Sequence, residues 1–180
     1  MAKQLLPRAL TTLIDELGNL PGVGVRTAER YAYHLLRTKA ESNKRLSNSI
    51  ANLKANVKYC PATFALIDAD EEISSLYADP TRNKKVIAVV EEPLDIIAIE
   101  RTGQYNGTYH VLGGVISPID NIGPEQLHIK ELAIRIKQDE VEEIIIATNA
   151  SVEGESTALF LQRYIKENEI NVKMSRLARG

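Results

Sequence analysis

The chain has 180 residues, of which 44% are hydrophobic and 26% are charged, and its formal net charge is −2. This composition is that of a globular protein with a buried core, and the length suits one ordinary domain with a small appendage. No apolar run is long enough to span a bilayer, no secretion signal follows the first residues, and the single cysteine, Cys60, excludes an internal disulfide framework. We therefore expect a cytoplasmic protein that does not bind membranes.

The charge is unevenly distributed along the chain. Residues 1–60 carry 10 Lys and Arg against 4 Asp and Glu, whereas residues 61–180 carry 12 against 20. A basic part joined to an acidic part indicates a polyanion-binding segment fused to something else. From charge alone, a chance drift of surface charge stays open as the alternative.

Three helices are predicted in the amino-terminal part. Apolar residues at helical spacing indicate a first helix over residues 5–17, with Gly18 as a stop after its end. The same spacing predicts a second helix over residues 26–38, and a third, more polar helix is expected over residues 43–57. Residues 1–57 are thus expected to form a helical DNA-binding or dimerisation region.

The turn between the first two helices has the pattern of a helix-hairpin-helix. It reads Leu20-Pro21-Gly22-Val23-Gly24, and Arg26 and Arg30 follow it one helical turn apart. Glycines let the backbone turn sharply and approach a phosphate without a Cβ in the way. The first amides of the second helix then point at that phosphate, and the two arginines add charge beside it.

Such contacts predict DNA binding that depends on salt and not on base sequence. Both single- and double-stranded DNA are expected as partners. Gly22, Gly24, Arg26 and Arg30 are therefore the predicted DNA-binding residues. Two other readings stay open, namely a structural corner in which the glycines only relieve strain and a packing surface for a second copy of the chain.

The segment that follows has no sustained periodicity. Residues 58–84 contain Cys60-Pro61, an acidic run over residues 68–72, and Asp79-Pro80. Proline and acidic residues in this arrangement indicate a linker or a small irregular module.

From residue 86 onwards, apolar strands alternate with helices. Strands are predicted over residues 86–91, 109–112, 143–148 and 171–174, and helices over residues 93–100, 124–137 and 153–166. Strands that are apolar on both faces and alternate with helices imply a parallel α/β sheet, which we expect over residues 85–180.

Acidic and amide side chains lie at the carboxyl ends of these strands, where open α/β sheets place their binding sites. Glu91 follows the first strand, Asn149 follows the third, and Glu153 opens the next helix. Two such glutamates can share a divalent cation. The alternative is that Glu153 and Glu155 only complement the positive end of their helix.

The strand-end arrangement resembles a Toprim domain, the acidic α/β module of primases and topoisomerases. Those enzymes follow the third strand with an Asp-x-Asp pair that holds magnesium, whereas this chain has Asn149 and Ser151 there. With so few carboxylates we expect neither tight metal binding nor phosphoryl chemistry.

Seven segments, in the same order over nearly the whole chain, resemble the RecR family of recombination mediators. They are Gly22-Val23-Gly24, residues 89–96, residues 100–105, residues 112–118, Gly123-Pro124, Ala147-Thr148-Asn149 and Glu153-Gly154-Glu155. The resemblance implies a helix-hairpin-helix region, a zinc-finger-like module over residues 58–84, and a Toprim domain.

The resemblance also implies a function without enzymatic activity. A RecR-like chain is expected to bind DNA in the RecF/RecO pathway of recombinational DNA repair and to help load RecA at single-strand gaps. Its expected partners are RecO, in some settings RecF, and further copies of itself in a dimer or a tetrameric ring. By this resemblance Arg26 and Arg30 contact DNA, and Glu91, Asn149 and Glu153 form the partner-binding face.

The chain departs from the family in its zinc module, which normally has four cysteines. Only Cys60 is present, and Ser74 and Tyr77 stand where the second cysteine pair belongs. One thiolate cannot supply a structural zinc site, so we expect no zinc and no cofactor beyond weakly bound Mg²⁺. In place of zinc, we expect a small apolar cluster of Tyr59, Phe64, Leu66, Ile67, Ile73, Leu76 and Tyr77.

A second departure is at the carboxyl end, where the family continues beyond Gly180 with a Gly-rich strand and a short helix that help to join subunits. On this basis the tetramer stays open.

Two alternative functions remain. One is a magnesium-dependent nuclease or primase-like enzyme of the Toprim type, with its metal at Glu91 and Glu153. The missing Asp-x-Asp pair argues against it, and so do His34, His110 and His128, none of which has a carboxylate partner in the sequence. The other is an adaptor that keeps the partner-binding face but has lost DNA binding.

Overall fold

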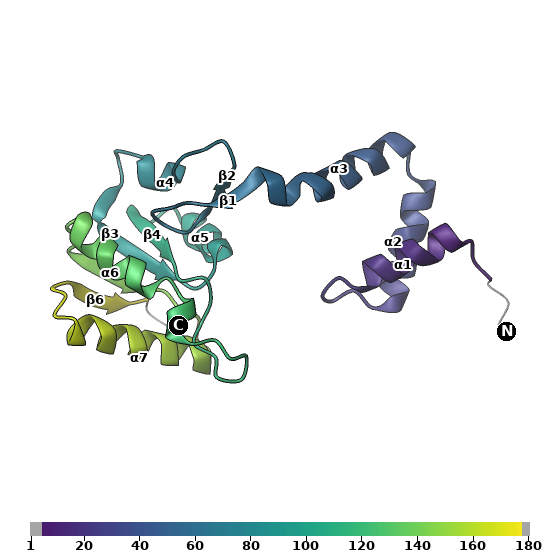
Figure 1. Ribbon diagram of the computed structural model, residues 1–180. Coiled ribbons are helices and arrows are strands. Elements are labelled where there is room, and N and C mark those ends of the chain that lie inside the picture. Colours follow the sequence, from purple (N-terminus) through teal and green to yellow (C-terminus); the bar gives the residue numbers. More distant parts are fainter. Residues whose placement is uncertain (1–4, 178–180) are drawn as a thin grey trace. The chain divides into compact units, whose positions relative to one another are not determined.

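The computed structural model describes residues 5–177, which fall into two compact units, residues 1–54 and residues 55–180 (Figure 1). No helix in the described part of the chain is both long and apolar enough to cross a membrane.

The first unit consists of α1 (Arg8–Gly18), α2 (Val25–Arg37) and most of α3 (Ala40–Asn56). α1 starts three residues later than predicted because Pro7, with φ −55° and ψ 140°, takes the N-cap position. α3 starts three residues earlier than predicted. The three predicted helices are otherwise confirmed.

This unit encloses very little apolar surface. Ala28 and Ala32 are the buried residues of α1, α2 and α3. The start of α3 is tied to the end of α2, because Asn43 Nδ2 donates to the Leu35 carbonyl oxygen at 2.8 Å. The large apolar side chains left exposed are Leu5, Leu6, Leu20, Val25, Leu36, Leu46, Ile50 and Leu53. The apolar stripes that predicted α1 and α2 are therefore only partly covered within the unit.

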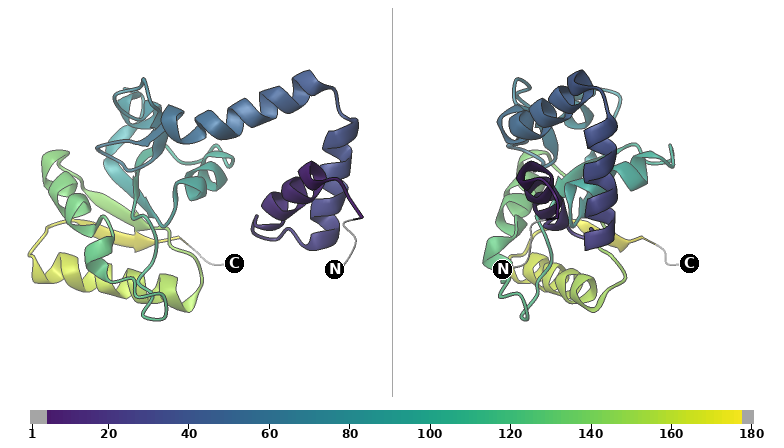
Figure 2. Two further views of the ribbon diagram at one scale, coloured as in Figure 1. Left: turned by 45° about the vertical axis from the view of Figure 1, so that its right-hand side comes forward. Right: turned by 90° about the vertical axis from the view of Figure 1, so that its right-hand side faces the viewer.

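The second unit is built on a four-stranded sheet, as the sequence predicts. Its strands are β3 (Asn83–Val90), β4 (Gly107–Val111), β5 (Glu143–Ile146) and β6 (Lys173–Arg176). They lie in the order β4-β3-β5-β6, and every neighbouring pair is parallel. The helices that cover the sheet are α5 (Pro93–Glu100), α6 (Ile129–Gln138) and α7 (Val152–Glu167) (Figure 2).

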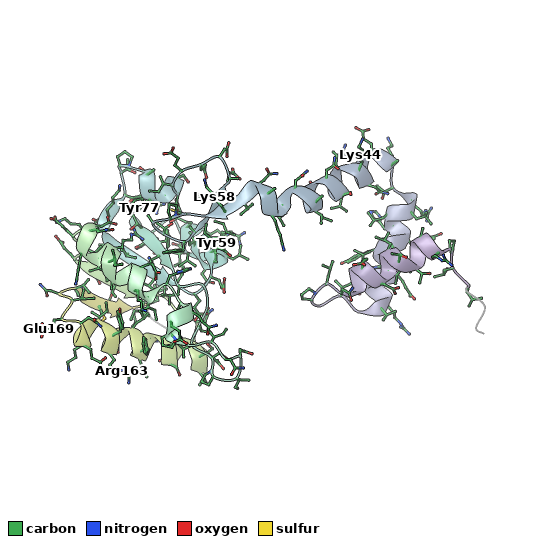
Figure 3. All side chains as sticks on the ribbon, viewed as in Figure 1. Lys44, Lys58, Tyr59, Tyr77, Arg163 and Glu169 are labelled. Carbon is green, nitrogen blue, oxygen red and sulfur yellow. The ribbon has the colours of Figure 1, made fainter. Side chains whose placement is uncertain are left out.

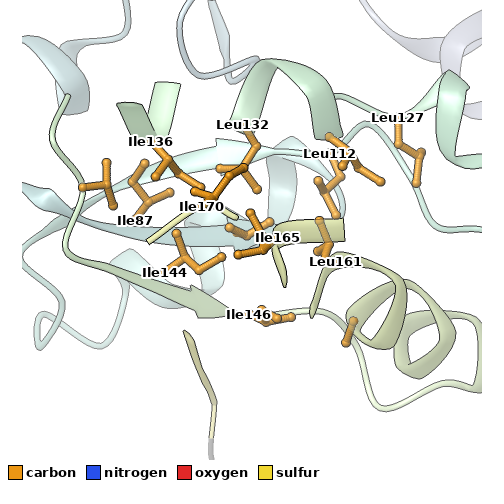
Figure 4. Packing of buried hydrophobic residues seen from close by; sticks show 14 residues of the cluster. Ile87, Leu112, Leu127, Leu132, Ile136, Ile144, Ile146, Leu161, Ile165 and Ile170 are labelled. Atoms are coloured by element: carbon orange, nitrogen blue, oxygen red, sulfur yellow. The ribbon is translucent and has the colours of Figure 1, made fainter. Parts of the chain in front are cut away.

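Alternate residues of β3 divide the interior into two cores. Ile87 and Val89 point into the larger one, which is lined by α6 and α7 (Figure 4). Ala88 and Val90 point to the opposite face, where they pack with Ile96 of α5. Because successive strand residues point to opposite faces, a strand in the middle of the sheet must be apolar throughout.

One predicted helix of this unit is divided in the structure. The predicted helix over residues 124–137 is interrupted: a short 3-10 helix, η1 (Pro124–Gln126), precedes α6. Between them Leu127 is buried in the larger core, and the His128 amide donates to the Leu112 carbonyl oxygen at 2.9 Å. This hydrogen bond draws the backbone toward β4 and out of helical geometry.

The segment before the sheet is an ordered small module. It contains β1 (Val57–Tyr59), which pairs antiparallel with β2 (Leu66–Asp68), and α4 (Ser75–Ala78). The Val111 amide donates to the Thr63 carbonyl oxygen at 2.9 Å, so the module is joined to the edge strand β4.

The predicted apolar cluster in this module is wrong in two of its members. Tyr59 and Leu66 are 64% and 46% exposed, and Figure 3 labels Tyr59 on this module. They are cross-strand partners on one face of a two-stranded ribbon, and no further layer covers that face. Ile67 of the predicted cluster is buried, and the other buried residues of the module include Cys60, Thr63, Ala65 and Ser74.

Candidate functional site

The hairpin presents an uncapped helix amino terminus. Gly22 has φ +77°, which makes the turn, and the Val23 amide donates to the Leu20 carbonyl oxygen at 3.0 Å. Gly24 is the N-cap of α2, and no side chain accepts a hydrogen bond from the first turn. Since the first amides of a helix have no intrahelical acceptor, those of α2 are available to an external anion.

The backbone requires glycine at only one of the two hairpin positions. At Gly22 the positive φ disfavours any other residue, which fits the reading of a structural corner. At Gly24 the backbone is ordinary, and a Cβ would meet no atom within 4 Å. Nothing in the chain itself therefore requires glycine at position 24, and the space in front of it is open.

The predicted arginines lie on the exposed side of α2. Arg26 and Arg30 are exposed, whereas Ala28 and Ala32 of the same helix are completely buried. The same exposed side continues with Tyr33 and Arg37, which the sequence reasoning missed. Their spacing of seven and eleven residues from Arg26 is the helical signal that identifies them.

The structure brings Glu91 and Asn149 together at the carboxyl ends of β3 and β5. The buried Glu91 carboxylate accepts hydrogen bonds from the Asn149 amide at 2.8 Å and from Asn149 Nδ2 at 2.5 Å. Both carboxylate oxygens are thus engaged by one neutral residue. Asn149 itself is exposed.

The amino terminus of α7 packs closely against this pair. Ser151 is its N-cap and accepts a hydrogen bond from the Gly154 amide at 3.0 Å. A Cβ at Gly154 would collide with the Asn149 carbonyl oxygen and with the Glu91 carboxylate, so glycine is required here by the close approach of the helix. The two positions that carry aspartates in Toprim enzymes are therefore Asn149, which holds the Glu91 carboxylate, and Ser151, which caps α7.

The two acidic residues of the first turn of α7 do not extend the Glu91–Asn149 pair. Glu153 is partly exposed, and within residues 5–177 no hydrogen bond joins its side chain to Glu91. Glu155 pairs with Arg176 of β6 at 2.6 and 2.8 Å. Both placements are those of acidic residues that complement a helix amino terminus. In the described residues, no group of three or more His, Cys, Asp or Glu side chains could hold a metal ion.

The donors at the zinc-module positions do not fit zinc. Cys60 is buried, and its Sγ accepts a hydrogen bond from the Ser74 amide at 3.3 Å. Burial raises the pKa of the Cys60 thiol, but hydrogen bonds from the Thr63 hydroxyl and from backbone amides outweigh burial and leave the pKa below its usual value. One thiol surrounded by hydrogen-bond donors is not the ligand set of a structural zinc site.

A polar network holds Tyr77, which stands in place of the last cysteine of the zinc module, against the sheet. The Tyr77 hydroxyl donates to Asp139 at 2.9 Å, and Asp139 pairs with Arg135 at 3.0 Å. The buried Arg135 guanidinium lies 4.8 Å from the Tyr77 ring centroid and donates to Thr108 Oγ1 at 2.7 Å. This network joins α4, α6 and β4.

His110 and His128 are structural residues of the same region. His110 Nε2 lies 2.8 Å from the His128 carbonyl oxygen, and the Phe64 ring stacks on the His128 ring at 3.7 Å. Burial, with a smaller contribution from the charge of Arg135, lowers the pKa of His110 to about 3. The residue is therefore neutral and packed in the interior.

Comparison with known proteins gives two family-model matches. Residues 10–54 match the model described as "RecR, helix-hairpin-helix", and residues 85–178 match the Toprim domain model. The chain is also similar to proteins named "Recombination protein RecR". One from Moorella thermoacetica is 48% identical over 97% of this chain and 85% of its own length. One from Streptomyces avermitilis is 48% identical over 93% and 82%, and one from Herpetosiphon aurantiacus is 41% identical over 98% and 84%.

Proposed function

This chain belongs to the RecR family and is a recombination-repair mediator, and we propose that it binds DNA through its hairpin and works with RecO to help load RecA at single-strand gaps. RecF is a further partner in some settings. The proposed protein acts in the cytoplasm and binds single- and double-stranded DNA without sequence specificity.

The observation that carries the proposal is the uncapped start of α2 beside two exposed arginines. The open space at Gly24 admits a phosphate oxygen to the first amides of the helix, where the helix dipole favours negative charge. Arg26 and Arg30 then bind neighbouring phosphates and release counterions, which makes the affinity depend on salt. None of these groups reads a base edge.

The proposed partner-binding face lies at the strand ends. Asn149 is exposed and Glu153 partly exposed, and both are available to RecO. Glu91 is 7% exposed, so its part in this face is to hold Asn149 in place. The neighbouring Val152 is 78% exposed and adds an apolar contact to the same face.

The proposed mediator has no enzymatic activity. Magnesium-dependent phosphoryl transfer needs several oxygen ligands around the ion, and here the Glu91 carboxylate is occupied by Asn149. The Toprim-type nuclease or primase-like alternative is therefore not favoured.

We also propose that the module over residues 58–84 folds without zinc. The hydrogen bonds to Cys60 and the Tyr77–Asp139 pair supply the cross-links that a metal ion would otherwise provide.

We propose self-association through the first unit. Leu46, Ile50 and Leu53 of α3 are exposed at a spacing of four and three residues, so they form one apolar stripe. A groove of about 440 Å³ beside this stripe is lined by Leu13, Leu17 and Leu35 as well. An apolar surface of this kind favours burial against a second copy of the chain.

The test is DNA binding by the double variant Arg26→Glu/Arg30→Glu, measured over a series of salt concentrations. Two charge reversals at phosphate contacts should abolish most of the affinity and reduce the slope of log affinity against log salt by about two. Far-UV circular dichroism should be unchanged, because both side chains are exposed.

Gly24→Ala is the second variant in this experiment. Its Cβ meets nothing in the chain, so the fold is kept and any loss of affinity reports contact between the backbone and a phosphate. Unchanged affinity and salt slope in the double variant would show that the hairpin does not bind DNA, which would favour the adaptor.

A further inference from the structure

We infer that the exposed face of α2 beyond the hairpin holds an unpaired stretch of DNA, with Tyr33 stacked on a base and Arg37 bound to a phosphate. The inference rests on the proposed function, because it extends the hairpin contact along the same helix. It specifies which form of DNA the site prefers.

The four side chains concerned lie on one side of the helix. Arg26, Arg30, Tyr33 and Arg37 are separated by four, three and four residues. At about 100° per residue they fall within roughly 60° of arc. Ala28 and Ala32, both fully buried, lie on the opposite side. The face is therefore a continuous exposed stripe of three cations and one aromatic ring.

Tyr33 has the exposure of a contact residue. It is 56% exposed, and the Arg37 guanidinium carbon lies 5.7 Å from its ring centroid. A ring held beside a cation offers a flat surface for a base while the cation remains near the phosphates. The combination of a basic track and aromatic side chains is the chemistry by which proteins hold single strands.

The same chemistry discriminates between single strands and duplex DNA. In a duplex each base is stacked between its neighbours and offers no face to Tyr33, so only the arginines make contact. In an unpaired strand the base faces are accessible, and stacking is added to the phosphate contacts. From Arg26 to Arg37 the helix rises about 16 Å, which spans several phosphates of one strand.

The experiment compares the affinities of the full chain for oligo(dT) and for a duplex of the same length. Tyr33→Leu should weaken oligo(dT) binding about tenfold and leave duplex binding within about twofold, whereas Tyr33→Phe should behave as the wild type because the ring is kept. Tyr59→Leu is the matched control, since Tyr59 is 64% exposed on the other unit.

Arg37→Gln tests the second contact. It should weaken binding to both forms of DNA and reduce the salt slope by about one. Its matched control is Arg163→Gln, because Arg163 is also exposed and lies 5.4 Å from an aromatic ring, that of Phe160. Ultraviolet cross-linking of iodouracil-substituted DNA should give an adduct at Tyr33.

Equal loss of oligo(dT) and duplex affinity in Tyr33→Leu, or no loss of either, would overturn the inference. A change in oligomeric mass in that variant would also overturn it, because Tyr33 would then contact a second copy of the chain. In each of these cases, a large loss of DNA affinity in Arg26→Glu/Arg30→Glu would still support the proposed function. If that double variant binds DNA like the wild type, the proposed function itself fails.

Discussion

At the scale of single residues, one amide side chain determines the chemistry of the strand ends. Asn149 stands where Toprim enzymes have an aspartate, and it donates two hydrogen bonds to the Glu91 carboxylate. An aspartate in that position would repel Glu91 unless a cation lay between them. The neutral amide instead donates to the Glu91 carboxylate, so this contact needs no cation.

His110 leads to a prediction about pH. Its folded pKa of about 3 is lower than the 6.5 of an exposed histidine, so its contribution to stability is fully present above pH 6.5 and is lost as the pH falls toward 3. Between pH 7 and pH 5 the free energy of unfolding should fall by about 2 kcal/mol from this residue.

The measurement is denaturant unfolding of the wild type and of His110→Gln at both pH values. The variant has no titrating group at this position, so its stability should decrease by about 2 kcal/mol less than that of the wild type over the same interval. Parallel pH dependences would show that His110 does not stay neutral in the folded state.

At the scale of elements, separate hydrogen bonds join the small module over residues 58–84 to β4 and to the end of α6. Thr63 accepts a hydrogen bond from β4, and Tyr77 of α4 pairs with Asp139 at the end of α6. A hydrogen bond to a carboxylate in a partly buried site stabilises more than one between neutral groups. The second contact is therefore expected to contribute most to the attachment of α4.

We predict that metal removal has no effect on this module and that loss of the Tyr77 hydroxyl does. EDTA should leave the melting temperature unchanged, and tag-free protein should contain zinc only at trace level. Tyr77→Phe should lower the free energy of unfolding by about 1.5 kcal/mol, because Asp139 loses one of its donors. Stoichiometric zinc, or a melting temperature lowered by EDTA, would contradict the metal-free module.

At the scale of the whole molecule, the two units differ in how they reach stability. The second unit has two apolar cores on either side of its sheet, whereas α1, α2 and α3 bury only Ala28 and Ala32. Three helices with so little enclosed surface need further burial to offset the entropy of ordering the chain. The proposed association between copies would supply that burial.

Ile50→Asp tests this association. Ile50 is 67% exposed, so the charge should not disturb the isolated subunit, but it should weaken self-association at least about tenfold. Sedimentation equilibrium gives the mass, and Leu159→Asp, at a position 61% exposed on α7, is the control. DNA affinity should fall with the mass because an assembly binds through several hairpins at once. An unchanged mass would place the contact elsewhere.

The sequence by itself determined the features that depend on local pattern. Helical spacing located α1 and α2, continuous apolar runs predicted the parallel sheet, and the Gly22-Val23-Gly24 turn identified the hairpin. These features follow from backbone geometry and from which face of an element is apolar, and both are visible within a short window of residues.

Only the tertiary structure decided how residues far apart in the sequence are used. The pairing of Glu91 with Asn149, the network of Tyr77 with Arg135 and Asp139, and the exposure of Tyr59 all depend on partners 40 or more residues away or on a layer that is absent. The interruption before α6 likewise comes from a hydrogen bond to Leu112. Burial and hydrogen bonding are set by the packing of whole elements, and no local pattern records them.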